Sequence, residues 1–202
     1  MKRIEFETKN LDKAKEYASK ELRISQEFID IEVIDKKGMI IKTYVVAATV
    51  NADPAEQGYK ALIDIFENMQ IQAQVEMRRR SENEIVYAIN TDENPLLIGK
   101  NGKTLENLQF YIRNLVNIYT DERLIVLVDI GGYKANRKKQ LEILATKTAK
   151  TVAKTRVSAK LQPMNAYERR IIHTKLAEWR DVSTISEGEG QQRHLVIKPK
   201  RR

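Results

Sequence analysis

The first fifty residues alternate between apolar and polar positions at both ends and show helical spacing in between. Ile4 and Phe6 alternate with charged residues, as the residues of a half-buried strand do. Asn10 can cap a helix, because the apolar residues that follow it recur on one helical face. Residues 29–33 alternate again, and after a short turn the apolar run 39–50 predicts a further strand. The pattern therefore predicts a small β-α-β-β domain over residues 1–52.

A second pattern begins at Asp53 and Pro54, which can cap and start a helix that runs to about Asn68. Two strands joined by a polar turn follow, and a short helical turn leads to Gly99. After Gly102 comes a strongly amphipathic helix, and a short apolar strand ends the region. The predicted elements are helix 54–68, strand 71–78, strand 84–89, helical turn 95–98, a helix after 102 and strand 124–128. This is an α-β-β-α-α-β order over residues 53–132.

Gly131 and Gly132 end that region, and the residues after them predict one long helix over 133–159. Few of its positions are apolar, so only a narrow stripe is expected to be buried. Beyond this helix we expect a strand near 160–162, a helix over 166–179 and a strand over 194–197. Separate helices and short sheets predict an α+β fold, in which residues 160–202 form a small α/β module.

Composition limits the chemistry that this chain can perform. Its 202 residues include no cysteine and only two histidines, which excludes disulfide scaffolds, zinc fingers and cysteine nucleophiles. No apolar run is long enough to cross a bilayer and the first residues lack a signal-peptide pattern, so we expect a cytoplasmic location. No nucleophile, base and orienting group form a catalytic pattern, and we expect neither an enzyme nor a bound metal or cofactor.

The net charge of +8 is unevenly distributed along the chain. Residues 1–52 carry +1 and residues 53–131 carry −5, whereas residues 132–160 carry +8 and residues 161–202 carry +4. A basic part joined to a slightly acidic part indicates that one end of the chain meets a polyanion such as nucleic acid. A solvated basic surface without a partner is the alternative.

The segment Ile98-Gly99-Lys100-Asn101-Gly102-Lys103 lies between two predicted helices. Its two glycines let the backbone turn tightly and leave no Cβ between the chain and a ligand. The N-terminus of the following helix would direct free N–H groups at a phosphate, and the two lysines add positive charge. The sequence therefore predicts that this loop holds a sugar-phosphate backbone. A plain turn between helices is the simpler alternative.

The same loop carries part of another nucleotide-binding motif. Gly102-Lys103-Thr104 ends like a Walker A motif, and residues 124–129 are similar to a Walker B strand. A complete Walker A motif needs glycine at position 97, where this chain has Leu97, and it follows a strand rather than a helical turn. A P-loop nucleotidase is therefore a remote alternative.

The predicted helix over 166–179 combines a defined start with basic residues on its outer side. Asn165 and Glu168 are spaced as a capping box, which fixes where the helix begins. Arg169 and His173 are four residues apart, and Arg180 is expected on the same side. A guanidinium and an imidazole on one exposed stripe can contact phosphate or base.

Two of these motifs resemble known nucleic-acid-binding domains. The α-β-β-α-α-β order with its 99–102 loop resembles a type II KH domain, a class that clamps single-stranded nucleotides at this loop. The resemblance implies a groove for bases lined by Ile98, Leu105 and Leu108. The run Tyr167-Glu168-Arg169-Arg170-Ile171-Ile172-His173 resembles the R3H domain, a small α/β module associated with single-stranded nucleic acid.

The succession of these domains resembles the bacterial Jag family, also called KhpB or EloR, over essentially the whole chain. The segments Gln162–Thr174 and Ser186–Glu189 and the layout of the N-terminal domain carry this resemblance. Two features depart from the family: Met39-Ile40-Ile41 stand where a glycine-rich stretch is common, and almost no linker precedes residue 53. The resemblance implies RNA binding, partnership with a small stand-alone KH protein and an influence on cell elongation and division.

These observations predict a three-module RNA-binding protein. Its segments are a Jag-type N-terminal domain (1–52), a type II KH domain (53–132), a long basic connecting helix (133–159) and an R3H domain (160–202). An interaction adaptor, with a KH-like surface that binds protein and a basic helix that binds membrane lipid or nothing, is the alternative, and the oligomeric state stays open. The predicted contacts to single-stranded RNA are the loop 98–103, then Arg169, Arg170, His173 and Arg180, then Lys134, Arg137, Lys138, Lys139, Lys147, Lys150 and Lys154.

Overall fold

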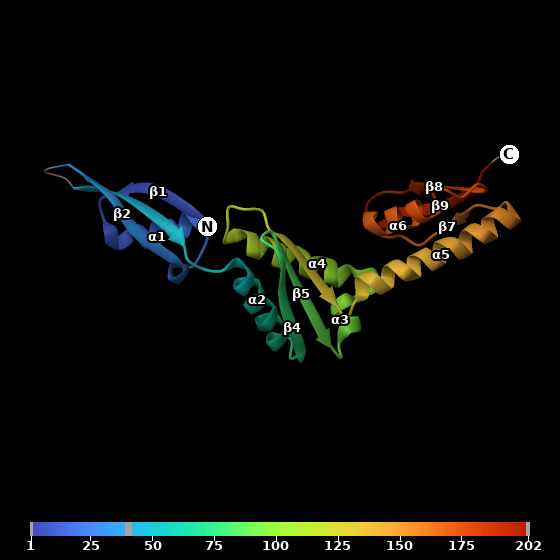
Figure 1. Cartoon of the computed structure of the whole chain (residues 1–202), viewed down its shortest axis with the longest axis horizontal. Coiled ribbons are helices and arrows are strands. Elements are labelled where there is room, and N and C mark those ends of the chain that lie inside the picture. Colours follow the sequence, from blue (N-terminus) through green and yellow to red (C-terminus); the bar gives the residue numbers. More distant parts are fainter. Residues whose placement is uncertain (1, 39–41, 201–202) are drawn as a thin grey trace. The chain divides into compact units, whose positions relative to one another are not determined.

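The computed structural model describes residues 2–38 and 42–200 of the chain (Figure 1). Its contacts divide the chain into two compact units, Met1–Gly131 and Gly132–Arg202. Within the described residues there are three sheets of three strands each, and helices pack against every one of them. This combination of separate helices and mainly antiparallel sheets confirms the predicted α+β class.

The N-terminal part of the first unit is an antiparallel sheet with one helix packed on it (Figure 1). Helix α1 (Ala14–Leu22) buries its alanine and leucine positions, and the Asn10 side chain caps the short 3-10 turn before it. The predicted β-α-β-β order is confirmed, although Met39, Ile40 and Ile41 of the last predicted strand lie outside the described residues. The strands, in the spatial order β1-β3-β2, are β1 (Arg3–Thr8), β3 (Thr43–Val50) and β2 (Ile29–Lys37).

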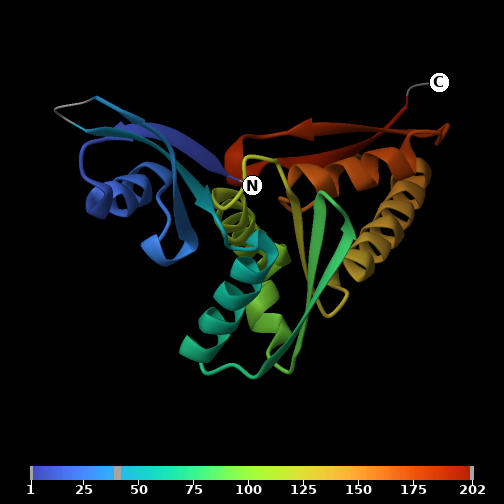
Figure 2. The same ribbon diagram turned by 60° about the vertical axis from the view of Figure 1, so that its left-hand side comes forward.

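The rest of the first unit is a second sheet with helices α2 and α4 on one face (Figure 2). Strand β5 lies between the other two, antiparallel to β4 and parallel to β6. The predicted α-β-β-α-α-β order is confirmed. The elements are α2 (Pro54–Asn68), β4 (Ala73–Ser81), β5 (Glu84–Thr91), α3 (Asn94–Ile98), the 3-10 turn η3 (Lys100–Gly102), α4 (Lys103–Ile118) and β6 (Ile125–Ile130).

Close packing of α2 against this sheet depends on a glycine. The Tyr87 hydroxyl is buried and donates a hydrogen bond of 2.8 Å to the Ala55 carbonyl in the first turn of α2. A Cβ at Gly58 would overlap that hydroxyl and the Val116 side chain, so only glycine lets the helix approach this far. Burial, together with the Asp53 carboxylate, raises the pKa of Tyr87 far above its ordinary value, so its hydroxyl stays a donor.

The second unit packs two helices against the third sheet (Figure 2). Its core combines an apolar stripe of α5, namely Leu141, Ala145, Ala149 and Val152, with apolar residues of α6 and of the sheet. The narrow stripe predicted for the long helix is therefore the side that is buried. The elements are α5 (Tyr133–Thr155), β7 (Ala159–Lys160), α6 (Ala166–Leu176), β8 (Val182–Glu187) and β9 (His194–Pro199), with the sheet in the order β7-β9-β8.

Both helices of the second unit end earlier than predicted. Helix α5 ends at Thr155 because Arg156 adopts the left-handed conformation (φ 61°) and its N–H closes on the Val152 carbonyl. Helix α6 ends at Leu176, three residues short of the predicted end. Arg180 therefore lies beyond the helix, and the prediction that it continues the side formed by Arg169 and His173 was wrong.

Strand β8 was not predicted from the sequence. Its inward side begins with Val182, which is fully buried, but the other large apolar residue, Ile185, is 47% exposed on the opposite face. Serine and threonine occupy most remaining positions, so the hydrophobic alternation is too weak to indicate a strand. Pairing with β9 forms it instead.

Candidate nucleic-acid interface

The loop between α3 and α4 owes its shape to three residues with positive φ. Gly99 (φ 70°, ψ −179°) occupies a region that is essentially restricted to glycine, and Asn101 (φ 54°) and Gly102 (φ 77°) are left-handed. The Gly99 N–H donates to the Pro95 carbonyl at 2.9 Å, and the Gly102 N–H donates to the Gly99 carbonyl at 3.2 Å. The chain therefore turns within these four residues and enters α4 directly.

The backbone of this loop is exposed on one side and packed on the other. A Cβ at Gly99 would overlap the Thr104 hydroxyl, so the first turn of α4 closes against the loop there. Gly102 is buried and has no side chain with which to cap α4; the Lys103 N–H donates to the Lys100 carbonyl, and no side-chain cap is formed at this end of the helix. The N–H groups of the first turn beyond Lys103 have no side-chain cap, and the exposed Lys100 and Asn101 lie beside them, so a phosphate can approach the helix N-terminus from this side of the loop.

Two lysines give this loop a positive charge within a region of net charge −5. The Lys100 side chain is exposed, and among the residues that the structure describes its ammonium forms no ion pair. The Lys103 side chain is 65% exposed and its ammonium lies 3.6 Å from a Glu106 carboxylate oxygen, a surface pair that salt and solvent weaken. Both ammonium groups can therefore turn toward an anion at the loop.

The three apolar residues expected to line a groove beside the loop divide into two kinds. Ile98 and Leu108 are half-buried and present apolar surface. Leu105 is only 2% exposed and belongs to the core under α4, so it supports the groove from beneath instead of lining it.

Helix α6 places the predicted Arg169 and His173 on the side that faces β8. The capping box is confirmed, because the Glu168 N–H donates to the Asn165 side chain at 2.9 Å and the Glu168 carboxylate accepts from the Asn165 N–H. The Arg169 guanidinium donates to the Met164 carbonyl at 2.7 Å, and His173 Nδ1 lies 2.6 Å from Thr184 Oγ1. The two side chains are thereby held in place.

The outer residues of α6 are freer than this pair. The Arg170 side chain is exposed, as is that of Arg180 beyond the helix end. The structure thus brings Arg169 and His173 together on one side of α6, whereas Arg170 is exposed on the helix and Arg180 is exposed beyond its end.

One basic residue of α5 serves the fold. Arg137 Nε donates to a Glu168 carboxylate oxygen at 2.7 Å, and the Glu168 side chain is only 5% exposed. This pair joins α5 to the first turn of α6. The sequence could not reveal it, because the two residues are 31 positions apart and the capping box already accounts for Glu168.

The remaining basic residues of α5 do not share one face. At about 100° per residue, Lys134 and Lys138 fall in line with the buried stripe, at its N-terminal end. Lys139, Lys147, Lys150 and Lys154 fall within an arc of about 80° on the exposed side. The single basic face predicted for this helix is therefore two separate groups of side chains.

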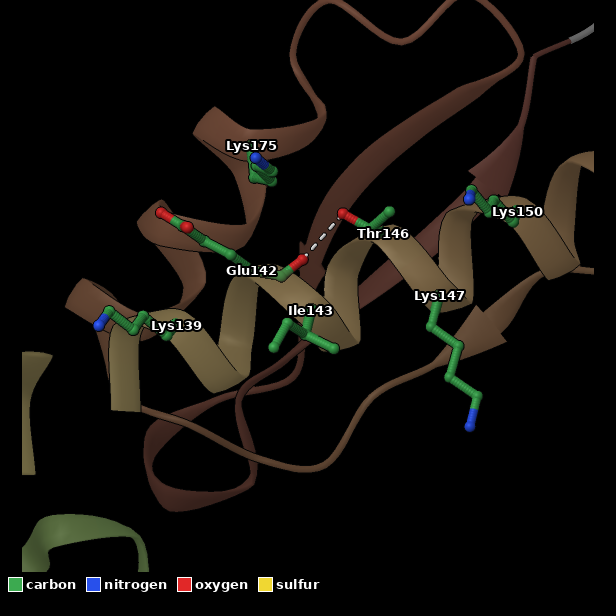
Figure 3. Close-up of a pocket in the computed structure, with 7 residues that line it drawn as sticks. All are labelled: Lys139, Glu142, Ile143, Thr146, Lys147, Lys150 and Lys175. Atoms are coloured by element: carbon green, nitrogen blue, oxygen red, sulfur yellow. Dashed lines mark hydrogen bonds between the residues drawn. The ribbon is translucent and has the colours of Figure 1, made fainter. Parts of the chain in front are cut away.

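Three lysines of the second group line a surface pocket of about 540 Å³ (Figure 3). Lys139, Lys147 and Lys150 come from α5, and Lys175 comes from α6. The close-up shows the Ile143 side chain between Lys139 and Lys147 along α5. The sequence analysis did not identify Lys175, because its position depends on how α6 packs against α5. It also did not identify Ile143, although the spacing of four residues from Lys139 and from Lys147 would have indicated it.

Among the residues that the structure describes, no three histidine, aspartate or glutamate side chains are grouped as a metal site would require. In the same part of the chain, no helix has the length and apolar character needed to span a membrane.

The chain is similar to known proteins along its whole length. The family model of the R3H domain matches residues 139–199. The chain is 34% identical to the RNA-binding protein KhpB of Bacillus subtilis (strain 168) over 209 residues, which cover both proteins completely. It is 32% identical to the RNA-binding protein KhpB of Clostridium symbiosum over all of this chain and 93% of that protein. A third relative of this name, from Lactiplantibacillus plantarum, is 35% identical over 54% of this chain and 34% of its own length.

Proposed function

The chain belongs to the KhpB family, and from this membership we propose that it binds single-stranded RNA through a type II KH domain over residues 53–132. The relatives are named RNA-binding proteins, and the name includes no enzymatic activity. In this proposal residues 1–52 are the Jag-type N-terminal domain. Residues 133–159 form the long helix that connects the KH domain to the R3H domain, which is assigned to residues 160–202. The Gly99–Gly102 loop is the observation that carries the proposal.

The loop supports phosphate binding through its backbone. Positive φ at Gly99, Asn101 and Gly102 turns the chain so that the uncapped N-terminus of α4 adjoins the loop. A phosphate there would accept N–H hydrogen bonds in the field of the helix dipole. Lys100 and Lys103 would add Coulombic attraction that an acidic region otherwise lacks. Bases would then rest on the half-buried Ile98 and Leu108.

The second unit supplies a second contact area in this proposal. Arg169 and His173 are held by Met164 and Thr184, and Arg170, Arg180, Lys134 and Lys138 add positive charge to the same unit. We leave Arg137 out of the contact set, because its guanidinium is paired with the buried Glu168. Phosphate contacts of this kind fix position along the strand without reading its bases.

The decisive test replaces Lys100 and Asn101 with aspartate. Asp tolerates the left-handed backbone of position 101, so the double variant keeps the loop conformation and places two carboxylates where phosphate would lie. We expect filter binding of single-stranded RNA at about 0.1 M salt to weaken by about tenfold or more.

The matched control is Lys60→Glu with Gln74→Glu, which removes the same three units of charge from exposed positions of the same region. It should bind RNA nearly as well as the unmodified protein. Equal binding by the loop variant and the control would show that the loop does not clamp RNA.

We further propose that this chain binds a small stand-alone KH protein and that the complex of the two proteins regulates cell elongation and division. The family resemblance alone supports this part. Co-purification of the two proteins and the length of cells depleted of this chain test it. Cells of unchanged length would contradict the regulatory role without bearing on RNA binding.

A further inference from the structure

The pocket between α5 and α6 combines a high positive charge with very little negative charge. Four lysines line it, and Glu142 is the single acidic residue in its lining. Among the described residues, none of the four ammonium groups donates to a carboxylate or carbonyl. By contrast, the Lys198 ammonium lies 2.7 Å from a Glu187 carboxylate oxygen. The four lysines of this pocket are therefore available to an external anion.

The positions of these lysines form a track rather than a point. Lys139, Ile143, Lys147, Lys150 and Lys154 share an arc of about 80° on α5, and they extend along about 22 Å of the helix at 1.5 Å per residue. Lys175 faces the same pocket from α6. A row of separate cations fits an extended polyanion better than it fits one small anion.

Ile143 is the unusual member of this row. Its side chain is 68% exposed, although the apolar stripe of the same helix, from Leu141 to Val152, is buried. It lies between Lys139 and Lys147 in the lining of the pocket (Figure 3). An exposed isoleucine among lysines offers apolar contact to a ligand that carries both phosphates and flat apolar groups.

This pocket is separate from the side of α6 that holds His173. His173 and Lys175 are two residues apart, so at about 100° per residue they point to opposite flanks of the buried stripe. His173 is engaged with Thr184 of β8, whereas Lys175 lines the pocket with α5. A ligand can therefore occupy the lysine pocket without touching the Arg169 and His173 pair.

We propose that the lysine pocket, formed by Lys139, Ile143, Lys147, Lys150 and Lys175, binds the backbone of single-stranded RNA and packs one of its bases on Ile143. The proposal rests on the proposed function, since it assigns a further segment of the same RNA to this chain. A bilayer surface fits less well, because a helix that lies on a membrane needs a continuous apolar face and the apolar face of α5 is turned into the core.

The charge of the pocket is tested with Lys147→Gln, Lys150→Gln and Lys175→Gln together in the full chain. We expect affinity for a labelled oligouridine at about 0.1 M salt to fall roughly tenfold to a hundredfold, and the log–log salt slope to become shallower by about 2. The control Lys9→Gln, Lys15→Gln and Lys60→Gln removes the same net charge from exposed lysines of the first unit. It should leave the slope nearly unchanged.

The apolar contact is tested with Ile143→Ser against Val157→Ser. Val157 is 67% exposed in the same unit but does not line the pocket, so the two variants remove equally exposed side chains. Ile143→Ser should weaken oligouridine binding several-fold with an unchanged salt slope, and it should not affect binding of inorganic polyphosphate, which has no bases. Val157→Ser should affect neither. An equal response to both probes would overturn the base contact.

The outcomes separate this inference from the function on which it depends. If the unmodified chain does not bind oligouridine, both are wrong. If it binds and the pocket variant matches its control in affinity and slope, only the pocket assignment fails. If the pocket variant keeps RNA binding but loses binding to vesicles with 30% phosphatidylserine, the pocket is a lipid site and the inference is overturned.

Discussion

The two units of this chain offer phosphate two physically different surfaces. In the first unit, a region of net charge −5 carries the loop that we propose binds through backbone N–H groups, and the φ angles of Gly99, Asn101 and Gly102 determine its shape. The second unit has a net charge of +12 and offers long lysine side chains on α5 and α6. The loop backbone of the first surface has a fixed conformation, whereas the second surface consists of flexible, positively charged side chains.

This difference suggests that the two surfaces contribute differently to RNA binding: one to the choice of ligand and the other to its electrostatic attraction. Backbone N–H groups at a helix N-terminus donate hydrogen bonds only at contact distance, so they bind only a ligand that fits the turn. Lysine ammonium groups act over about a Debye length and weaken as salt is added. We therefore expect the loop to decide which strand conformation is bound and the basic unit to decide how strongly salt affects binding. The same contrast between a fixed backbone and mobile charged side chains predicts different responses to substitution and to salt in the two units.

The largest effect is expected where a basic residue of the second unit stabilises the fold. Arg137→Met leaves the buried Glu168 carboxylate without its cation, which should lower the free energy of unfolding by about 3 kcal/mol. Urea unfolding followed by Trp179 fluorescence measures this, because Trp179 is the one tryptophan of the chain and packs against the core of the second unit.

The neighbouring Lys138→Met is the control, since the Lys138 side chain is exposed. It should change stability by no more than about 0.5 kcal/mol. Equal loss of stability in the two variants would mean that Arg137 contributes to the second unit only through its charge.

An intermediate effect is expected at the loop of the first unit. Gly99→Ala places a Cβ against Thr104 in a backbone region that is essentially restricted to glycine, and should cost about 2 kcal/mol. Gly132→Ala is the matched comparison, because Gly132 has φ +68° but nothing within 4 Å of its ideal Cβ. It should cost only about 1 kcal/mol. Circular dichroism during urea unfolding measures both, and a smaller cost for Gly99→Ala would contradict the packing against Thr104.

The smallest effect compares one exposed carboxylate in each unit. The Arg78 guanidinium holds the pKa of Glu76 below its ordinary value, and the Lys198 ammonium does the same for the pKa of Glu187. Glu187 also lies in the field of His194 and Lys160. Salt screens distant charges more than contacting ones, so added salt should raise the pKa of Glu187 more than that of Glu76.

Titration of both carboxyl groups by NMR checks this difference. The stability that each pair contributes is present above the unfolded pKa of its glutamate and is lost as the pH falls through the lowered folded pKa. Lys198→Met should return the pKa of Glu187 toward its ordinary value. An equal response of the two glutamates to salt would show that the charge of the second unit does not extend beyond its direct contacts.

Local signals in the sequence predicted most elements of the fold. Asp53 and Asn165 cap the helices that were placed after them, because a side-chain oxygen before an apolar period is a local and strong signal. The early end of α6 depends on long-range contacts, since the Lys200 ammonium donates to the Trp179 carbonyl and the Lys200 N–H donates to the Asp181 carbonyl. Local propensity does not include contacts of this kind.

The candidate site likewise contains features that local sequence predicts and features that it does not. The sequence predicted the loop, because glycine spacing and the order of elements are local properties. The role of Arg137 depends on a carboxylate 31 residues away, and the position of Lys175 depends on how α6 lies beside α5. Helical spacing by itself could have separated Lys134 and Lys138 from the lysines of the exposed side, because that division needs only the 3.6-residue repeat.

The contact between Gly99 and Thr104 limits which substitutions this loop can accept during evolution. Replacing Thr104 with a smaller residue would remove the steric conflict at position 99, but the backbone there would still favour glycine. No single change, and no order of two changes at these positions, therefore leads to a side chain at 99 without passing through a less stable protein. The positive φ of Asn101 favours asparagine, aspartate or glycine there, whereas Lys100 has no such constraint, so the backbone of this loop leaves the choice of residue open only at position 100.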